Sequence, residues 1–214
     1  MLLEVYAAPP FEKNGFVVGC EDTREGIIID PGDEVEDLLA GVRRLGLTVR
    51  YILLTHAHVD HVTGVARAKA ALGVPVGLHP GDEFLYNGVV QQGMMFGLRV
   101  EPQPKIDFFY DGTPIRFGRY VVDVRHTPGH CPGGVCLAIG REDKAERTLF
   151  VGDTLFAGSI GRTDLPGGDM NTLLRSIREV LFRYPDDTVV YSGHGESTTI
   201  GREKRSNPFV IGQP

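Results

Sequence analysis

The sequence has few cysteines and lacks any long apolar run. Its three cysteines, Cys20, Cys131 and Cys136, are odd in number and irregularly spaced, so they do not form a disulfide framework and fit a reducing compartment. The start of the chain, MLLE, has neither the basic segment nor the apolar core of a signal peptide, and no later run could span a bilayer. We therefore expect a cytoplasmic protein with no membrane partner.

Basic residues are scarce relative to acidic ones. The chain has 22 Lys and Arg against 28 Asp and Glu, a formal net charge of -6, whereas a nucleic-acid-binding face normally shows clustered Lys and Arg on a basic domain. The most basic segment, 202–205 (REKR), is short and contains an acid, so its simplest interpretation is a solvated helix face. We therefore expect no nucleic-acid partner.

The length and the hydrophobic content allow a sizeable core. With 214 residues, of which 42% are hydrophobic, the chain could form one domain or two small ones. Neither a low-complexity linker nor a clear internal repeat divides it. The sequence therefore predicts a single domain over residues 1–214.

Strand-like segments dominate both halves of the chain, and helical segments follow them. Hydrophobic periodicity and turn residues predict strands at 17–20, 26–30, 50–54, 74–78, 113–117, 120–125, 134–139, 148–151 and 188–191. They predict helices at 33–45, with Asp33 as its cap, at 62–72 and at 170–183, and a short basic helix near the C-terminus. Residues 80–104 are expected to form a helix and loops along one wall of a pocket. This order suggests two sheets packed face to face with helices outside.

The most informative segment is THAHVDH, in which His56, His58, Asp60 and His61 lie within six consecutive positions. Imidazole nitrogen and carboxylate oxygen are ligands that zinc, iron and manganese share, and four of them on one turn can serve two cations. The apolar run 51–54 leads directly into this turn, which places it at the end of a buried strand, where functional loops gather. A polar turn with merely solvated histidines is the weaker interpretation.

Three more residues of ligand type stand at similar places. His130, Asp153 and His194 each directly follow a glycine at the end of a strand-like run. Glycine adopts unusual backbone dihedrals without a steric penalty, so the chain can turn sharply toward a metal there. Each pair is weak evidence by itself, but together with the first cluster the seven residues predict that four strand ends converge on one metal site.

This series of seven residues resembles the full ligand set of the metallo-β-lactamase superfamily, over nearly the whole chain. The segments 127–130 (TPGH), 152–156 (GDTLF) and 161–164 (GRTD) are similar to the glyoxalase II and persulfide dioxygenase branch. The segment 206–209 (SNPF) is similar to short bacterial members of that branch, which lack the C-terminal helical domain that grips glutathione. The resemblance implies a four-layer αβ/βα sandwich, an α+β arrangement of two mixed β-sheets with helices on the outer faces.

The resemblance also implies two divalent metal ions, with zinc expected and iron or manganese as alternatives. The implied ligands are His56, His58 and His130 for one metal, Asp60, His61 and His194 for the second, and Asp153 between them. The expected activity is glyoxalase II-like hydrolysis of a thioester, of the hydroxyacylglutathione hydrolase type. A hydroxide bridging the metals attacks the acyl carbon, with Asp60 and Asp153 as catalytic residues. The substrate is a small acyl-thiol whose thiol stays open, as does the oligomeric state, with a homodimer as one option.

Residues next to this set have two interpretations each. Asp30 resembles the buried aspartate of the family that accepts the outer N–H of a metal-bound histidine, while helix capping by Asp30 or Asp33 is the alternative. Arg162 is expected to bind an anionic group of the substrate or, alternatively, to form only a surface ion pair with Asp164. Cys131 is expected to be a thiol near the ligands rather than a reactive one.

The remaining histidines, His79 and His126, are expected to be structural, with the mouth of the pocket as the alternative place for His79. Cys20 and Cys136 lie in apolar runs and are expected in the core.

The competing function is that of a persulfide dioxygenase. Such relatives keep all seven residues but use a single non-haem iron, at the positions of His56, His130 and Asp153, and the segment GRTD favours them. Cleavage of RNA would require a basic surface. Classical β-lactamases commonly have a Cys ligand where this chain has Asp153. A pure scaffold would not explain a complete ligand set.

Overall fold

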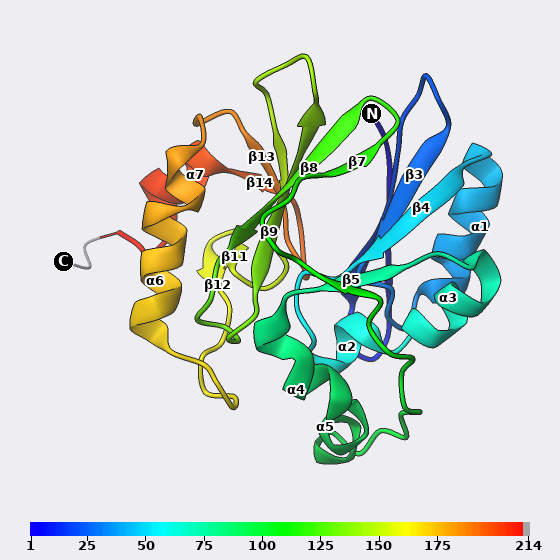
Figure 1. Cartoon of the computed structure of the whole chain (residues 1–214). Helices are drawn as coiled ribbons and strands as arrows, with labels where there is room; N and C mark the ends of the chain where they lie inside the picture. Colours follow the sequence, from blue (N-terminus) through cyan, green and yellow to red (C-terminus); the bar gives the residue numbers. More distant parts are fainter. Residues whose placement is uncertain (212–214) are drawn as a thin grey trace.

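Two mixed β-sheets lie face to face across the middle of the molecule, and helices cover their outer faces (Figure 1). The computed structural model describes residues 1–211 of the chain. In spatial order, the first sheet contains β1 (Leu2–Ala8), β2 (Lys13–Gly19), β3 (Glu25–Ile29), β4 (Thr48–Leu53), β5 (Val76–Leu78) and β6 (Phe108–Phe109). The second contains β14 (Thr198–Thr199), β13 (Val189–Tyr191), β10 (Thr148–Phe150), β9 (Val135–Arg141), β8 (Tyr120–His126) and β7 (Ile115–Phe117). A small separate sheet pairs β11 (Leu155–Phe156) with β12 (Ser159–Ile160).

Helices α1 (Val35–Leu45) and α3 (Val65–Leu72) cover the first sheet, whereas α6 (Met170–Glu179) and α7 (Ile200–Ser206) cover the second (Figure 1). The short helices α2 (Val59–Val62), α4 (Glu83–Asn87) and α5 (Val89–Met95) lie together at the lower edge of this view. Two 3-10 turns, η1 (Pro80–Asp82) and η2 (Leu181–Arg183), precede α4 and follow α6.

Local sequence explains where the main helices begin and end. Asp169 caps α6, because its carboxylate accepts a hydrogen bond from the backbone N–H of Thr172 at 2.7 Å. Helix α1 ends at Gly46, whose φ of 62° is a left-handed conformation that glycine adopts without strain.

Buried hydrophobic side chains form three layers between the four layers of backbone. The layer between α1, α3 and the first sheet includes Val17, Ile28, Leu38, Leu39 and Ile52. The layer between the sheets includes Phe16, Ile27, Leu53, Leu137 and Phe150, and the layer under α6 and α7 includes Ala138, Leu149, Leu173, Ile177 and Ile200. Neighbouring residues such as Phe16 and Val17 belong to different layers because successive side chains of a strand point to opposite faces. The predicted four-layer sandwich is confirmed.

The parallel strands direct their carboxyl ends to one rim. Strand β3 pairs with β4 in parallel, and β10 pairs with β13 in parallel. The turns that follow these strands therefore leave from the same end of each sheet, as expected where ligands bind to open sheets.

Most predicted elements are present, and the differences have physical causes. The sequence does not predict β1, an edge strand in which no residue is fully buried. It also does not predict the short strands β6, β11, β12 and β14, which depend on pairing with other strands. The helix predicted at 62–72 corresponds to α3, which begins at Val65, and the separate helix α2 precedes it. The helix predicted at 170–183 ends in the turn η2.

Asp33 does not cap α1, so that prediction is wrong. The residue before the helix is Glu34, without a side-chain capping bond. The carboxylate of Asp33 instead accepts a hydrogen bond from Thr63 Oγ1 at 2.9 Å. Glu34 is occupied elsewhere, because its Oε1 pairs with the buried ammonium of Lys13 at 2.6 Å and accepts the N–H of Gly32 at 2.9 Å.

Among residues 1–211, no helix is both long and apolar enough to cross a membrane. The single domain over residues 1–214 stays a prediction, and its last three residues lie outside those that the structure describes.

Candidate metal centre

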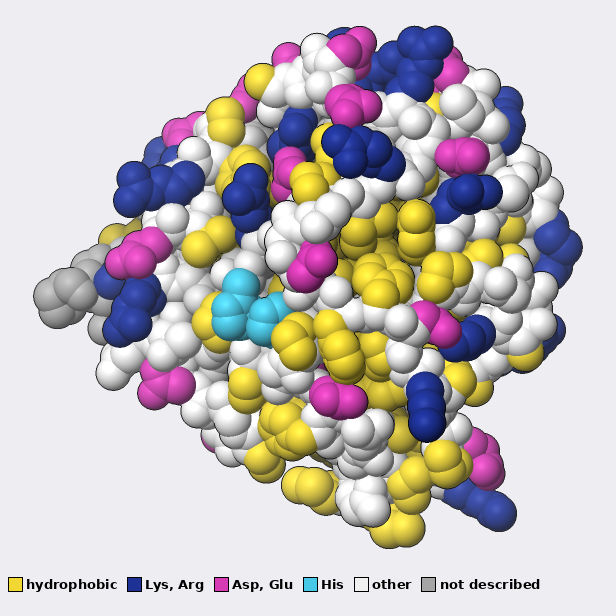
Figure 2. All heavy atoms as spheres, viewed as in Figure 1, with side chains coloured by type: hydrophobic (Ala, Val, Ile, Leu, Met, Phe, Trp, Pro, Cys, Tyr) yellow, Lys and Arg dark blue, Asp and Glu magenta, His cyan; other side chains and the backbone are white. Residues whose placement is uncertain are grey.

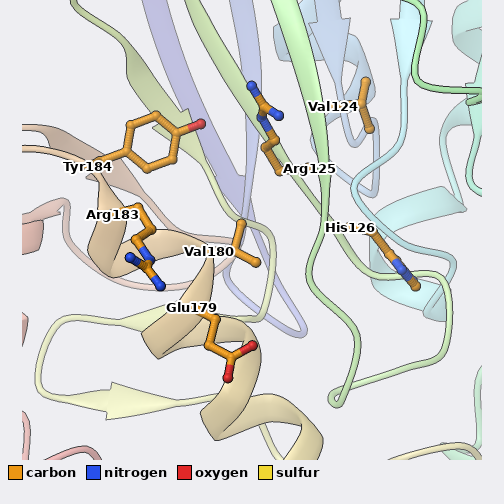
Figure 3. A pocket seen from close by; sticks show the side chains of 7 residues that line it. All are labelled: Val124, Arg125, His126, Glu179, Val180, Arg183 and Tyr184. Atoms are coloured by element: carbon orange, nitrogen blue, oxygen red, sulfur yellow. The ribbon is translucent and has the colours of Figure 1, made fainter.

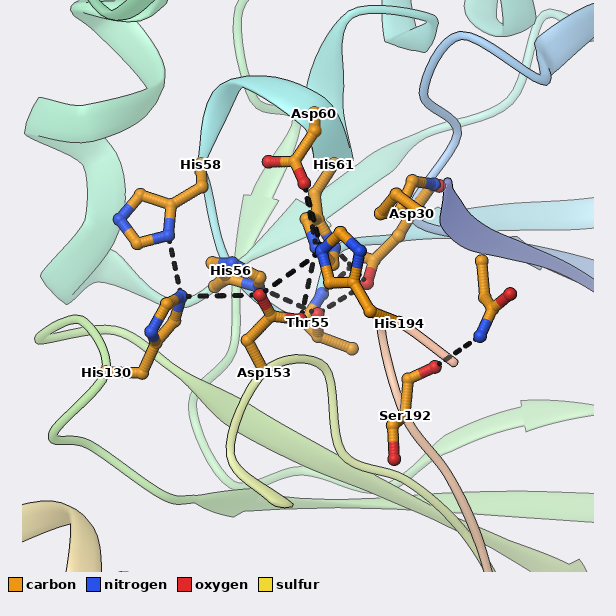
Figure 4. Close-up of polar contacts among 12 residues, drawn as sticks. Asp30, Thr55, His56, His58, Asp60, His61, His130, Asp153, Ser192 and His194 are labelled. Atoms are coloured by element: carbon orange, nitrogen blue, oxygen red, sulfur yellow. Dashed lines mark hydrogen bonds and ion pairs between the residues drawn. The ribbon is translucent and has the colours of Figure 1, made fainter. Parts of the chain in front are cut away.

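Seven predicted site residues lie close together at one rim of the two sheets, on turns that follow the carboxyl ends of strands (Figure 4). The turn after β4 carries His56, His58, Asp60 and His61, the loop between β8 and β9 carries His130, and the turns after β10 and β13 carry Asp153 and His194. Segments far apart in the sequence thus contribute to one cluster of imidazoles and carboxylates.

The first ligand group consists of His56, His58 and His130. Each offers a ring nitrogen, and these atoms all lie within 4.8 Å of one another. His58 Nδ1 lies 2.8 Å from His130 Nε2. All three side chains are buried, with at most 7% of their surface exposed. Three imidazoles at this spacing can hold one divalent cation.

The second ligand group consists of Asp60, His61 and His194, and its ligand atoms also lie within 4.8 Å of one another. His194 Nε2 is 3.2 Å from Asp60 Oδ2, and His61 Nε2 is 3.8 Å from the same oxygen. This group is more open, because the His194 side chain is 30% exposed and that of Asp60 14%.

Asp153 lies between the two groups. One of its oxygens is 3.4 Å from His61 Nε2, and the other is 3.6 Å from His130 Nε2 and 3.5 Å from His194 Nε2. A carboxylate in this position can contact cations in both groups.

Glycines beside the ligands allow these close approaches. A Cβ atom at Gly193 would lie 2.1 Å from Asp153 Oδ1, so only glycine fits between the two ligand turns there. Gly152 has a φ of 51°, the left-handed conformation in which the chain turns after β10.

Hydrogen bonds on the outer side orient three of the rings. The Nδ1–H of His130 donates to the carbonyl of Arg162 at 2.7 Å, and the Nδ1–H of His194 donates to the carbonyl of Phe11 at 3.2 Å. The Nδ1 of His61 contacts the carboxylate of Asp30 at 2.9 Å. In each ring Nε2 is therefore the nitrogen that faces the other ligand atoms, as in metal-ligating histidines whose other nitrogen is anchored.

Asp30 has the outer position that its resemblance implied, and it does not cap a helix. It is fully buried and, besides His61, accepts hydrogen bonds from the backbone N–H of Thr55 at 2.7 Å and from the Thr55 hydroxyl. Asp30 with His56 and His61 also forms a close group. Its oxygens are already occupied by these donors, so we count it as a support rather than as a ligand.

Unpaired buried atoms indicate that the site fits a metal. Five buried side-chain nitrogen or oxygen atoms have no hydrogen-bond partner among residues 1–211, and four of them are His56 Nε2, His58 Nε2, His61 Nε2 and Asp153 Oδ1. Buried polar groups are normally paired. Their concentration in one cluster of metal-ligand chemistry is explained by one or more cations.

The electrostatics of the two groups differ. Burial and the neighbouring histidines lower the pKa of His58 to about 3 and that of His56 well below its usual range, so both rings are neutral and ready to bind a metal. Burial alone would also lower the pKa of His61, but the charges of Asp60, Asp153 and Asp30 together raise it to about 10. The second group therefore concentrates negative charge that favours a bound cation.

A pocket of about 160 Å³ opens onto both groups. Apart from ligand residues, it is lined by Phe11, Val59, Gln92, Phe96, Arg162 and Leu165. Residues from the 80–104 segment thus form part of its wall, as predicted. Hydrophobic side chains are also exposed on α4 and α5, including Phe84, Met94 and Met95, and Figure 2 shows hydrophobic surface along this lower edge.

A larger pocket of about 550 Å³ lies elsewhere, between β8 and α6 (Figure 3). It is lined by Val124, Arg125, His126, Glu179, Val180, Arg183 and Tyr184, and it contains no residue of either ligand group. His126 stacks on His79 with ring centroids 4.1 Å apart, and neither ring lines the smaller pocket. The structural interpretation of both histidines therefore fits best.

Arg162 combines features of both of its predicted roles. Its guanidinium forms a bidentate pair with Asp164, with distances of 2.7 and 2.6 Å, yet the residue also lines the smaller pocket.

Cys131 is buried and donates its S–H to Asp82 Oδ2 at 3.1 Å, and burial raises the pKa of this thiol well above its usual value. It is therefore a neutral thiol rather than a nucleophile. Cys20 and Cys136 are buried core residues, as predicted.

Several residues around the site were not predicted from the sequence. Asn14 donates its side-chain amide to the carbonyls of Ser192 and Gly195, on either side of His194. Asp82 and Gln92 bind the backbone of the turn after β4. No local pattern distinguishes these polar residues from surface ones, because the partners named here lie at least 25 positions away.

The sequence and the fold match one family. Residues 8–194 match the Metallo-beta-lactamase superfamily. The chain therefore belongs to the metallo-β-lactamase superfamily.

Within that family, the chain is similar over its whole length to a named relative. It is 38% identical to hydroxyacylglutathione hydrolase GloC of Haemophilus influenzae, and the match covers 98% of each chain. The resemblance to glyoxalase II is thus supported by full-length similarity.

Three solved structures are also similar. BLEG-1 B3 metallo-β-lactamase has a TM-score of 0.89 and 36% identity, over 99% of this chain and 100% of that one. TTHA1623 in a di-iron-bound form has a TM-score of 0.84 and 40% identity, over 96% and 99%. ETHE1 from Myxococcus xanthus has a TM-score of 0.79 and 29% identity, over 100% and 86%. Metal-binding clusters fit this superfamily, whereas the identity of the metal differs among its members.

Proposed function

We propose that this protein is a metal-dependent thioester hydrolase of the glyoxalase II type. One observation carries the proposal: two three-ligand groups lie on either side of Asp153 at the floor of a small pocket. The full-length similarity to GloC supports the same activity. Cytoplasmic location and a small acyl-thiol partner remain part of this proposal.

In this proposal His56, His58 and His130 would hold one divalent cation, Asp60, His61 and His194 would hold a second, and Asp153 would be available to both. When bound, such cations make hydroxide available at neutral pH and polarise a carbonyl oxygen. The side chains of the protein would have to place the acyl carbon of the substrate next to Asp153 and keep the two ligand groups at a fixed distance from each other. The thiolate that leaves is stable, so no strong acid is needed beside it.

The size of the pocket limits what can enter it. A cavity of about 150 Å³ accommodates a molecule the size of benzene, and this pocket has about 160 Å³. The acyl group and the sulfur of a small thioester therefore fit, whereas the remainder of the thiol would lie outside, along the exposed edge of α4 and α5.

The walls of the pocket are mainly apolar. Phe11 and Phe96 contact each other edge to face with ring centroids 5.6 Å apart, next to Val59 and Leu165. Gln92 uses its side chain to bind backbone groups, with distances of 2.8 to 3.2 Å. Arg162 is thus the cation available to an anionic group of the substrate at this wall.

A persulfide dioxygenase is the second candidate. The similarity to ETHE1 and the segment GRTD favour it. In that case a single iron would lie at His56, His130 and Asp153, and the second group would stay without a metal.

Metal analysis paired with two assays separates the candidates. Purified protein is analysed for zinc, iron and manganese, then assayed for thiol release from S-lactoylglutathione and for oxygen uptake with glutathione persulfide. Two metals per chain with thiol release support the hydrolase, whereas one iron with oxygen uptake overturns it. The similarity to BLEG-1 makes a β-lactam a useful third substrate in the same assay.

A further inference from the structure

A buried carboxylate outside the seven residues, Asp82, lies behind the first ligand group. It has no exposed surface. Its Oδ2 accepts the backbone N–H of Ala57 at 3.0 Å and the S–H of Cys131 at 3.1 Å, and its Oδ1 accepts the backbone N–H of Gly133 at 2.6 Å. One side chain therefore receives three hydrogen bonds from two different segments.

These two segments carry all three residues of the first ligand group. Ala57 stands between His56 and His58, and Cys131 directly follows His130. The segments lie far apart in the sequence, and Asp82 joins them through the backbone and the thiol. Its carboxylate thus fixes the distance between the two histidines of one turn and the histidine of the other.

A helix-capping role for Asp82 does not account for these contacts. Asp82 stands at the start of α4, but its side chain makes no capping hydrogen bond there. Burying an ionised carboxylate is costly unless several donors surround it, and burial raises the pKa of Asp82. The donors that offset this cost come from the ligand segments rather than from the helix.

Close packing between Gly133 and Asp82 shows that the loop after His130 fits this carboxylate. A Cβ atom at Gly133 would lie 2.5 Å from the backbone nitrogen of Asp82 and 2.7 Å from its carboxyl carbon. Only glycine allows the loop after His130 to approach the carboxylate so closely.

We propose that Asp82 is a positioning residue for the metal at His56, His58 and His130, and that it acts selectively on this metal. The inference rests on the proposed function only in that the seven residues bind metal. Partners that orient metal ligands typically change metal affinity by about 10- to 100-fold when they are lost. Asp82 would act less directly than such partners, because it binds the backbone of the turns that carry the ligands and not the imidazoles themselves.

The decisive variant is Asp82→Asn, which keeps the shape but replaces one acceptor oxygen by an NH₂ donor. The amide oxygen can accept at most two of the three donors, so at least one hydrogen bond between Asp82 and the ligand segments is lost. Metal-free wild type and variant are titrated with Co²⁺, and absorption spectra report the two binding steps. We expect the dissociation constant of one step to rise about 10- to 100-fold while the other is unchanged. Anomalous diffraction at limiting Co²⁺ then shows which group keeps the ion, and we expect the second.

The matched control is Glu203→Gln. Glu203 is also fully buried and accepts three hydrogen bonds, from the N–H of Gly158 at 2.9 Å, from the Asn207 amide at 2.8 Å and from the Thr198 hydroxyl. None of these three partners is a ligand residue or the direct neighbour of one in the sequence. This variant should lose thermal stability while both Co²⁺ affinities stay at the wild-type values.

Two results would overturn the inference: unchanged Co²⁺ binding in Asp82→Asn, or equal weakening of both steps. If that variant does not fold, Gly133→Ala disturbs the same contact from the other side and must weaken the same binding step. The proposed function is tested separately, because wild-type protein that binds metal without releasing thiol would refute the hydrolase and leave the role of Asp82 intact.

Discussion

The two ligand groups lie side by side, but the protein supports them in different ways. The first group is deeply buried, and Asp82 holds its two turns through backbone N–H groups. The second group is partly exposed, and Asp30 contacts one of its imidazoles directly, while Asn14 holds the turn that carries His194. The first half of the site is thus held through the backbone of its two turns, whereas the second is held through the imidazole of His61 and through the backbone beside His194.

Removal of the residue between the groups should have the largest effect. Asp153→Ala deletes the carboxylate that lies within 3.6 Å of histidines in both groups. We expect thiol release to fall by more than about 100-fold, beyond the range for outer residues, together with loss of bound metal. Metal analysis and a thioester assay on the same preparation check this. Full turnover by the variant would contradict a role between two cations.

The counterpart of Asp82 in the second group is Asp30. Its φ of 48° is a left-handed conformation that Asn also tolerates, so Asp30→Asn preserves the backbone and removes the charge next to His61. We expect about 10- to 100-fold weaker binding at the second group and a smaller change at the first, because Asp30 also binds Thr55, next to His56. Co²⁺ titration reads out both steps. If Asp30→Asn and Asp82→Asn weakened the same step most, the two halves of the site would not have separate supports.

A smaller effect is expected from Asn14→Ala. The variant loses two hydrogen bonds, to Ser192 at 3.0 Å and to Gly195 at 2.9 Å. Each such bond contributes about 1 kcal/mol, so the free energy of unfolding should fall by about 1–2 kcal/mol. Because His194 stands between the two acceptors, binding at the second group should weaken by less than in Asp30→Asn. Urea unfolding with and without metal measures both, and a greater loss at the first group would contradict the separate support of the two groups.

The smallest effect on the metal centre is expected from Arg162→Ala. The exposed pair with Asp164 contributes at most about 1 kcal/mol to stability, so metal content and unfolding should change little. If Arg162 binds an anionic group of the substrate, KM rises while kcat is nearly unchanged. Steady-state kinetics with S-lactoylglutathione check this. Asp164→Ala serves as the control, since it frees the guanidinium and should not raise KM. Equal kinetics in both variants would leave only the surface ion pair.

Local patterns carry most of the fold prediction. The short apolar run of β2 and the helical spacing of α1 are set by neighbours in the sequence, and the structure has both elements. Strands such as β6 and β14 have two residues each and exist only because another strand pairs with them. The capping prediction for Asp33 is wrong because a capping residue and a tertiary partner of Thr63 look the same in sequence.

The sequence by itself determined which side chains can bind metal and that each stands at a turn after a strand, because ligand type and strand ends are local properties. The family resemblance implied the two groups and the place of Asp30, and only the tertiary structure decided which other residues hold the groups. Asp82 and Asn14 act on partners 25 to 181 positions away. Such contacts arise when two sheets close on each other, and no spacing in a single chain encodes them.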